Sequence, residues 1–123
     1  MPVRSLNSPV LKWPHRDEVK KALRRWIEKQ IIKHPEIIQL GYFGSLAKDN
    51  WGVGSDLDLI VILQDSSIPF EKRPLAWDFD TLPVSTDILL YTMKEWQDMR
   101  KKGGRFVDTI EKEAVWLYPE NKI

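Results

Sequence analysis

The segment Leu57–Leu63 (LDLIVIL) is apolar except for Asp58. An apolar run of this length, bounded by polar residues, indicates a β-strand that is buried on both faces. Such a strand needs other strands beside it and other elements above and below it. The run therefore predicts a sheet inside an α/β domain rather than a helical bundle.

The rest of the chain supplies elements for such a fold. Apolar residues recur at three- and four-residue steps between Arg16 and Lys33, which predicts an amphipathic helix ending at His34-Pro35. Further strands are predicted at 37–43, 84–92 and 115–118, and helices at 70–78, 92–101 and 106–113. The expected fold class is α/β.

Length and composition limit the class of protein. With 123 residues, 42% hydrophobic and 30% charged, the chain suits one globular domain, expected at 16–123 behind an irregular arm at 1–15. The net charge of +1 gives no overall field toward nucleic acid or membrane. The sequence has no cysteine and no membrane-spanning apolar run, so we expect no disulfide or thiolate site and a cytoplasmic location.

Polar residues with a clear chemistry gather just before the apolar run. Gly44 allows a sharp turn and a close backbone approach, and Ser45 offers an N–H and a hydroxyl, the donors that a phosphate needs. Asp56 and Asp58 are two residues apart, so on a strand both side chains point to the same face. Paired carboxylates are suitable ligands for Mg²⁺ shared with substrate phosphates.

This stretch resembles the signature of the nucleotidyltransferase superfamily of the DNA polymerase beta type, and most closely its small stand-alone members, the minimal nucleotidyltransferases. That signature is Gly-Ser, a ten-residue spacer, Asp-x-Asp and a third Asp on a later strand. Gly44-Ser45 and Asp56-x-Asp58 match with this spacing, and Asp87 is the acidic residue of the predicted strand 84–92. The resemblance extends from about Ile37 to the C-terminus. The family spacer often begins Arg-Ala-Arg-Gly, whereas residues 46–49 are Leu-Ala-Lys-Asp, which keeps one basic position as Lys48.

The resemblance implies a nucleotidyltransferase fold, an activity and a site. Together with the pattern of elements, it predicts a small mixed sheet of about four strands, with helices mainly on one face. Asp56, Asp58 and Asp87 are expected to converge as catalytic residues and as ligands of two Mg²⁺ ions. Gly44, Ser45 and Lys48 are expected to bind the phosphates of a nucleoside triphosphate. The implied reaction transfers a nucleoside monophosphate, AMP from ATP, to a hydroxyl acceptor.

The resemblance also implies a partner. Minimal nucleotidyltransferases are often the antitoxin of a toxin–antitoxin pair with a helical HEPN-type protein, and the acceptor hydroxyl is then expected on that partner. The alternative is a non-catalytic module that neutralises a HEPN-type ribonuclease toxin sterically. The nucleotide preference, and whether the chain forms homo- or hetero-oligomers, stay open.

Three polar clusters have competing interpretations. The basic residues of the helix 16–33 are interpreted as a solvated face rather than as a surface for RNA or an acidic partner. Arg100, Lys101, Lys102 and Arg105 either compensate a helix dipole or contact a phosphate or partner. Asp78 and Asp80 repeat the Asp-x-Asp spacing but are expected in a solvated loop, because no apolar strand follows them.

Overall fold

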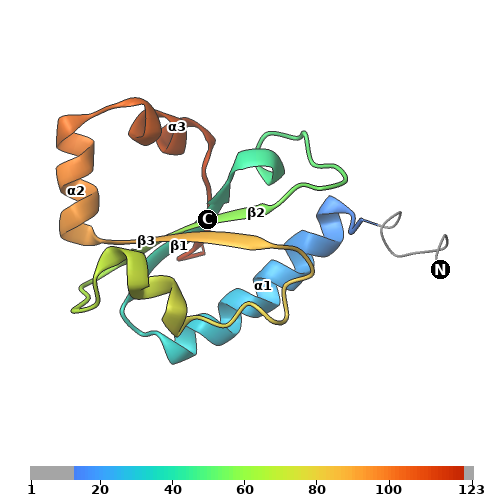
Figure 1. Ribbon diagram of the computed structural model, residues 1–123, viewed down its shortest axis with the longest axis horizontal. Coiled ribbons are helices and arrows are strands. Elements are labelled where there is room, and N and C mark those ends of the chain that lie inside the picture. The colour runs from blue at the N-terminus through green and yellow to red at the C-terminus, as the bar shows by residue number, and fades with distance from the viewer. Residues whose placement is uncertain (1–12, 121–123) are drawn as a thin grey trace.

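A computed structural model describes residues 13–120, so most of the expected N-terminal arm lies outside the described residues. In chain order, the elements are α1 (Arg16–Lys33), β1 (Ile37–Phe43), the 3₁₀ helix η2 (Gly44–Leu46), β2 (Leu57–Leu63), the 3₁₀ helix η3 (Phe70–Ala76), β3 (Thr86–Thr92), α2 (Met93–Lys102), α3 (Arg105–Glu113) and β4 (Val115–Tyr118) (Figure 1). Among residues 13–120, no helix combines the length and the apolar character that crossing a membrane requires.

The strands form one mixed four-stranded sheet in the order β3-β2-β1-β4. β1 pairs antiparallel with β2 and with β4, whereas β2 and β3 run parallel. The expected mixed sheet of about four strands is therefore confirmed. The apolar run Leu57–Leu63 is an inner strand, as its composition predicts.

Each face of the sheet has its own core. Leu57, Leu59 and Val61 of β2 pack in the cluster that includes the apolar stripe of α1. Ile60 and Ile62, which alternate with them, pack against Trp96 of α2 and against α3. Figure 1 shows α1 on one side of the sheet and α2 with α3 on the other. The helices thus cover both faces instead of lying mainly on one, because β2 is apolar at successive positions and both its faces need cover.

The segment between β2 and β3 departs most from the sequence-based expectation. Instead of a helix at 70–78 it forms the 3₁₀ helix η3 at Phe70–Ala76, with Pro74 inside it. Proline at this position removes a backbone donor and favours a short helical element. The strand expected from residue 84 begins at Thr86.

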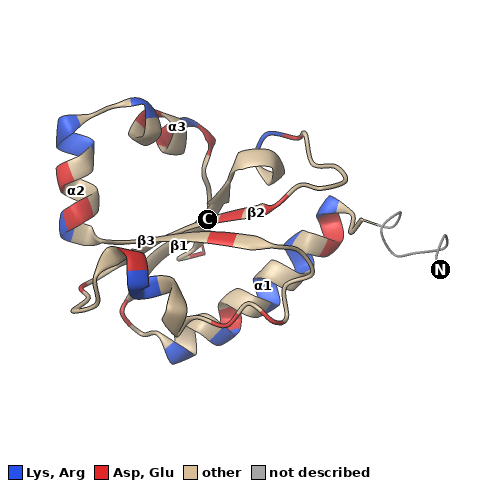
Figure 2. Cartoon of the chain, in the orientation of Figure 1, with Lys and Arg blue, Asp and Glu red and all other residues tan. Residues whose placement is uncertain are grey.

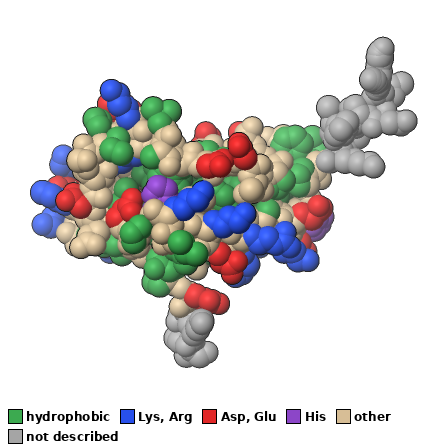
Figure 3. Space-filling view, turned by 90° about the horizontal axis from the view of Figure 1, so that it is seen from below, with side chains coloured by type: hydrophobic (Ala, Val, Ile, Leu, Met, Phe, Trp, Pro, Cys, Tyr) green, Lys and Arg blue, Asp and Glu red, His purple; other side chains and the backbone are tan. Residues whose placement is uncertain are grey.

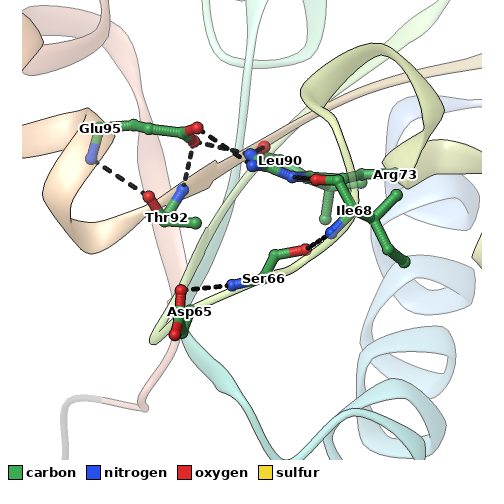
Figure 4. Close-up of polar contacts among 7 residues, drawn as sticks. All are labelled: Asp65, Ser66, Ile68, Arg73, Leu90, Thr92 and Glu95. Atoms are coloured by element: carbon green, nitrogen blue, oxygen red, sulfur yellow. Dashed lines mark hydrogen bonds and ion pairs between the residues drawn. The ribbon is translucent and has the colours of Figure 1, made fainter.

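One buried arginine attaches η3 to the edge of the sheet. Arg73, 6% exposed, donates hydrogen bonds to the carbonyl oxygens of Ile68 and Leu90 and to both carboxylate oxygens of Glu95. Glu95 also accepts a hydrogen bond from the backbone N–H of Thr92, which caps α2 (Figure 4). This network joins η3, β3 and α2, and it occupies backbone groups on an edge strand that could otherwise pair with another chain.

Candidate active site

Two of the expected carboxylates lie side by side on neighbouring strands. Asp58 of β2 is directly opposite Asp87 of β3 in the parallel register. Asp58 alternates with Leu57 and Leu59, so it lies on the sheet face that carries α2 and α3, and Asp87 shares that face because the two residues are in register. Figure 2 shows the acidic positions of β2 and β3 next to each other. Two residues far apart in the sequence thus form a carboxylate pair.

Asp56 contributes a third negative charge. It is exposed, immediately before the start of β2 and two residues from Asp58. Burial raises the pKa of the Asp58 carboxyl above its ordinary value, and the charges of Asp87 and then of Asp56 raise this pKa further. Asp58 therefore lies in the field of both other carboxylates, an arrangement that a cation would relieve.

Gly44 lies against Asp58 of this pair. β1 ends at Phe43, which is opposite Asp58, and Gly44 then turns the chain with a φ of 73°. A Cβ atom on Gly44 would lie 2.2 Å from Oδ2 of Asp58. Glycine is therefore required here both by the left-handed backbone and by the carboxylate beneath it.

The loop after Gly44 is folded by its own backbone. The carbonyl oxygen of Gly44 accepts hydrogen bonds from the N–H groups of Ala47 and Lys48, and the carbonyl of Ser45 accepts one from Asn50. Asp49 has a φ of 62° and pairs with Arg16 of α1. Asp49 occupies the position where the minimal nucleotidyltransferases usually have glycine. Aspartate is one of the few other residues that tolerate a left-handed backbone conformation.

Lys48 has a partner that sequence reasoning missed. Its Nζ atom lies 3.6 Å from Oε1 of Glu113, the last residue of α3, and the lysine side chain is half exposed. The same Oε1 atom is buried without a hydrogen bond. No sequence pattern links Lys48 to Glu113, because the contact depends on how α3 packs beside the Gly44 loop.

The carboxylates suit a hard divalent cation, although their oxygen atoms do not converge on one point in the described part of the chain. Within residues 13–120, no three Asp, Glu, His or Cys side chains are arranged to hold a metal ion as they stand. The expected convergence of Asp56, Asp58 and Asp87 is therefore formed only in part, as the Asp58–Asp87 pair with Asp56 nearby. Oxygen ligands of this type are those that Mg²⁺ and similar ions take.

Comparison with known proteins identifies the family. Residues 16–122 match the family model of the nucleotidyltransferase domain. The chain belongs to this family. Nucleotidyl transfer is thus the reaction class of the domain, and the family implies a nucleoside triphosphate substrate and a divalent metal, which the carboxylates described above are suited to bind.

A solved structure supports the fold. The crystal structure of a candidate nucleotidyltransferase from Sulfolobus solfataricus superposes with a TM-score of 0.62 at 13% identity, covering 95% of this chain and 93% of that one. The expected nucleotidyltransferase fold is therefore confirmed. No curated protein matches the chain.

The remaining polar clusters lie apart from the carboxylate pair. Asp78 and Asp80 are both exposed, and Oδ1 of Asp78 accepts a hydrogen bond from the Asp80 N–H, so this second Asp-x-Asp organises its own loop. The basic residues 100–102 form the last turn of α2, and Arg100 pairs with Glu111 of α3 at 3.5 Å. Within residues 13–120, neither cluster forms a salt bridge with a residue of the Gly44 loop.

Proposed function

We propose that this nucleotidyltransferase domain transfers a nucleoside monophosphate from a triphosphate to a hydroxyl group, with Asp56, Asp58 and Asp87 as its catalytic, metal-binding residues. The observation that carries the proposal is the Asp58–Asp87 pair, in register on parallel strands, with Gly44 against Asp58. Gly44 brings the phosphate-binding loop against the carboxylate, so triphosphate and metal ligands share one place.

The metal is proposed to be Mg²⁺, with two ions bound between the carboxylates and the phosphates. When bound, such ions neutralise phosphate charge and make a hydroxyl easier to deprotonate. Asp56, Asp58 and Asp87 would hold these ions, and Asp58 lies in the field of both other carboxylates.

The other residues have proposed roles in binding and transfer. Ser45 donates hydrogen bonds to the β- and γ-phosphates, and Lys48 exchanges Glu113 for a phosphate oxygen. The acceptor oxygen forms a bond to the α-phosphorus while the bond to the bridging oxygen breaks and pyrophosphate leaves. Asp87 takes part in removing the proton of the acceptor hydroxyl. Positioning and charge neutralisation supply most of the rate gain.

A thermal shift experiment tests the site. Mg²⁺ with a non-hydrolysable ATP analogue at 100 times its Kd is expected to stabilise the wild-type protein by about 2.7 kcal/mol. Asp58→Asn removes the central charge at constant shape and is expected to abolish this shift. Asp65→Asn, which neutralises an exposed carboxylate beyond the opposite end of β2, serves as the control and should keep it. Equal shifts in wild type and Asp58→Asn would place the nucleotide elsewhere.

The proposed donor is ATP, and the proposed acceptor is a hydroxyl, such as that of a tyrosine, on a HEPN-type partner toxin. The resemblance of the Gly44–Asp58 signature to minimal nucleotidyltransferases supports this step. Exposed apolar side chains in and beside η3 are of the kind that anchor a protein partner: Ile68, Phe70 and Leu75.

Mass spectrometry of a co-expressed neighbouring gene product tests the acceptor. We expect a mass increment of a nucleotidyl group on that partner, lost with Asp56→Ala. Neutralisation of the partner's toxicity by Asp56→Ala, with no increment in either case, would instead favour a steric antitoxin.

A further inference from the structure

α1 carries a series of basic side chains at four-residue steps that the catalytic proposal does not use. Lys21, Arg25, Lys29 and Lys33 follow one another at four-residue steps, and all four are exposed. We call these four residues the basic row. Figure 3, which views the molecule from the α1 side, shows Lys and Arg side chains gathered across this face. The row spans about 18 Å along the helix, at the 1.5 Å rise of each residue.

The basic row forms no salt bridge within the described part of the chain, although Asp17 lies four residues before Lys21 and Glu28 three residues after Arg25. Asp17 and Glu18, the acidic residues in the first turn of α1, interact with His15. Like charges four residues apart destabilise a helix, so an array of this kind is best satisfied by negative charge from another molecule.

The shape of the row favours one class of partner. The apolar stripe of α1 is buried against the sheet, so the helix has no apolar face to insert into a bilayer. Protein interfaces are built around apolar anchors, whereas Ile32 is the only large apolar side chain of α1 that is strongly exposed. A regularly spaced array of cations that winds along a helix instead matches the repeating charge of a phosphate backbone.

We propose that the basic row binds the phosphate backbone of a single nucleic-acid strand, without reading its sequence. The nearly balanced net charge of +1 hides this surface, because the positive charge is concentrated on one helix. On this proposal the basic row is a binding surface, whereas the sequence alone favoured a solvated helix face. It lies on the opposite side of the sheet from Asp58 and Asp87, so the proposal is independent of the catalytic one.

Fluorescence anisotropy with a labelled 20-nucleotide oligo-dT, in EDTA and without nucleoside triphosphate, tests the proposal. The triple variant Lys21→Gln, Arg25→Gln and Lys29→Gln is compared with wild type between 50 and 200 mM salt. The plot of log K against log salt has a negative slope, and each lost phosphate contact makes it about 0.7 less steep. The slope of the triple variant should therefore be less steep than that of wild type by about 2. Affinity at the lowest salt should fall at least roughly tenfold.

A matched variant removes three exposed lysines from three other elements: Lys72→Gln, Lys94→Gln and Lys112→Gln. It loses the same charge but leaves the row intact, so its slope should stay within about 0.7 of wild type. Melting temperatures establish that both variants fold. Equal loss of binding in the two triple variants, or no oligo-dT binding by wild type at 50 mM salt, would overturn the proposal. Displacement of oligo-dT by poly-glutamate at equal charge concentration would also overturn it, in favour of an acidic protein partner.

Discussion

Gly44 and Gly54 have similar backbone conformations in different surroundings. Their φ angles are 73° and 86°, both in the left-handed region. A Cβ at Gly44 would meet Asp58, whereas a Cβ at Gly54 would meet nothing within 4 Å. The two residues therefore separate the cost of backbone strain from the cost of crowding the carboxylate.

Alanine at each glycine gives a matched pair of variants. Gly54→Ala and Gly44→Ala should each lose about 1 kcal/mol of stability from the left-handed backbone. Only Gly44→Ala should also lose the thermal shift given by Mg²⁺ and nucleotide, because its methyl group displaces Asp58. Denaturant unfolding and thermal shift measure both effects. Retention of the full nucleotide shift by Gly44→Ala would contradict the role given to this contact.

The surroundings of Asp58 disfavour its charged form. Its carboxyl is partly buried beside two like charges, and burial is the larger cause of its raised pKa. Asp58→Asn should therefore raise the melting temperature of the metal-free protein at pH 7, since an amide neither repels Asp87 nor loses a charge to desolvation. A fall in the metal-free melting temperature would show that the carboxylate stabilises the fold instead.

At the scale of elements, the ion pair of Arg73 and Glu95 connects η3 to α2. The hydrogen bond from Arg73 is the main reason that the pKa of Glu95 lies below its ordinary value of 4.5. A lowered carboxyl pKa stabilises the fold at pH values above the unfolded pKa, and this stability is lost as the pH falls through the folded pKa.

Glu95→Gln should therefore destabilise the protein at pH 7 and not in acid. We expect a loss of about 1–2 kcal/mol, less than for a fully buried pair because the Glu95 side chain is 40% exposed. The difference from wild type should shrink below about pH 4.5 and disappear once wild-type Glu95 is protonated in the folded state. Urea unfolding at several pH values checks this.

A surface pair on the same helix provides the control for that measurement. Lys94 and Asp98 are paired at 3.3 Å, four residues apart and well exposed. Asp98→Asn should change stability at pH 7 by less than about 0.5 kcal/mol. An effect of Glu95→Gln no larger than that of Asp98→Asn would mean that the Arg73 network contributes little.

Local sequence signals predicted an element well where residues within or next to that element determine its bounds. The amphipathic stripe and the His34-Pro35 stop gave α1 as Arg16–Lys33, and the helix expected at 92–101 is α2, which a capping box of Thr92 and Glu95 begins. The segment before β3 was less predictable, because distant contacts determine it. Trp26 of α1 donates a hydrogen bond to the carbonyl of Asp78, and Arg73 bonds to Leu90. No local pattern encodes such contacts.

At the scale of the whole molecule, the order of strands in the sheet determines which distant residues lie together, and the sequence alone did not predict this. The motif predicted the mixed sheet and named the candidate carboxylates, but the position of Asp87 opposite Asp58 follows from the parallel pairing of β2 and β3. The placement of helices on both faces follows from the same sheet, since α2 and α3 return over Ile60 and Ile62. Glu113 of α3 lies beside Lys48 because α3 packs on this face of the sheet. Strand pairing, rather than motif spacing, assembles the candidate site.

Binding of Mn²⁺, followed by electron paramagnetic resonance with a non-hydrolysable ATP analogue, tests the central claim most directly. Mn²⁺ takes the same oxygen ligands as Mg²⁺ and is observable in solution. If Asp87 and Asp58 form one metal–nucleotide site, wild type binds Mn²⁺ more tightly with the analogue than without it, and Asp87→Asn weakens that binding at least roughly tenfold, as expected when a metal ligand is lost. The same nucleotide-dependent Mn²⁺ affinity in wild type and Asp87→Asn would contradict the account.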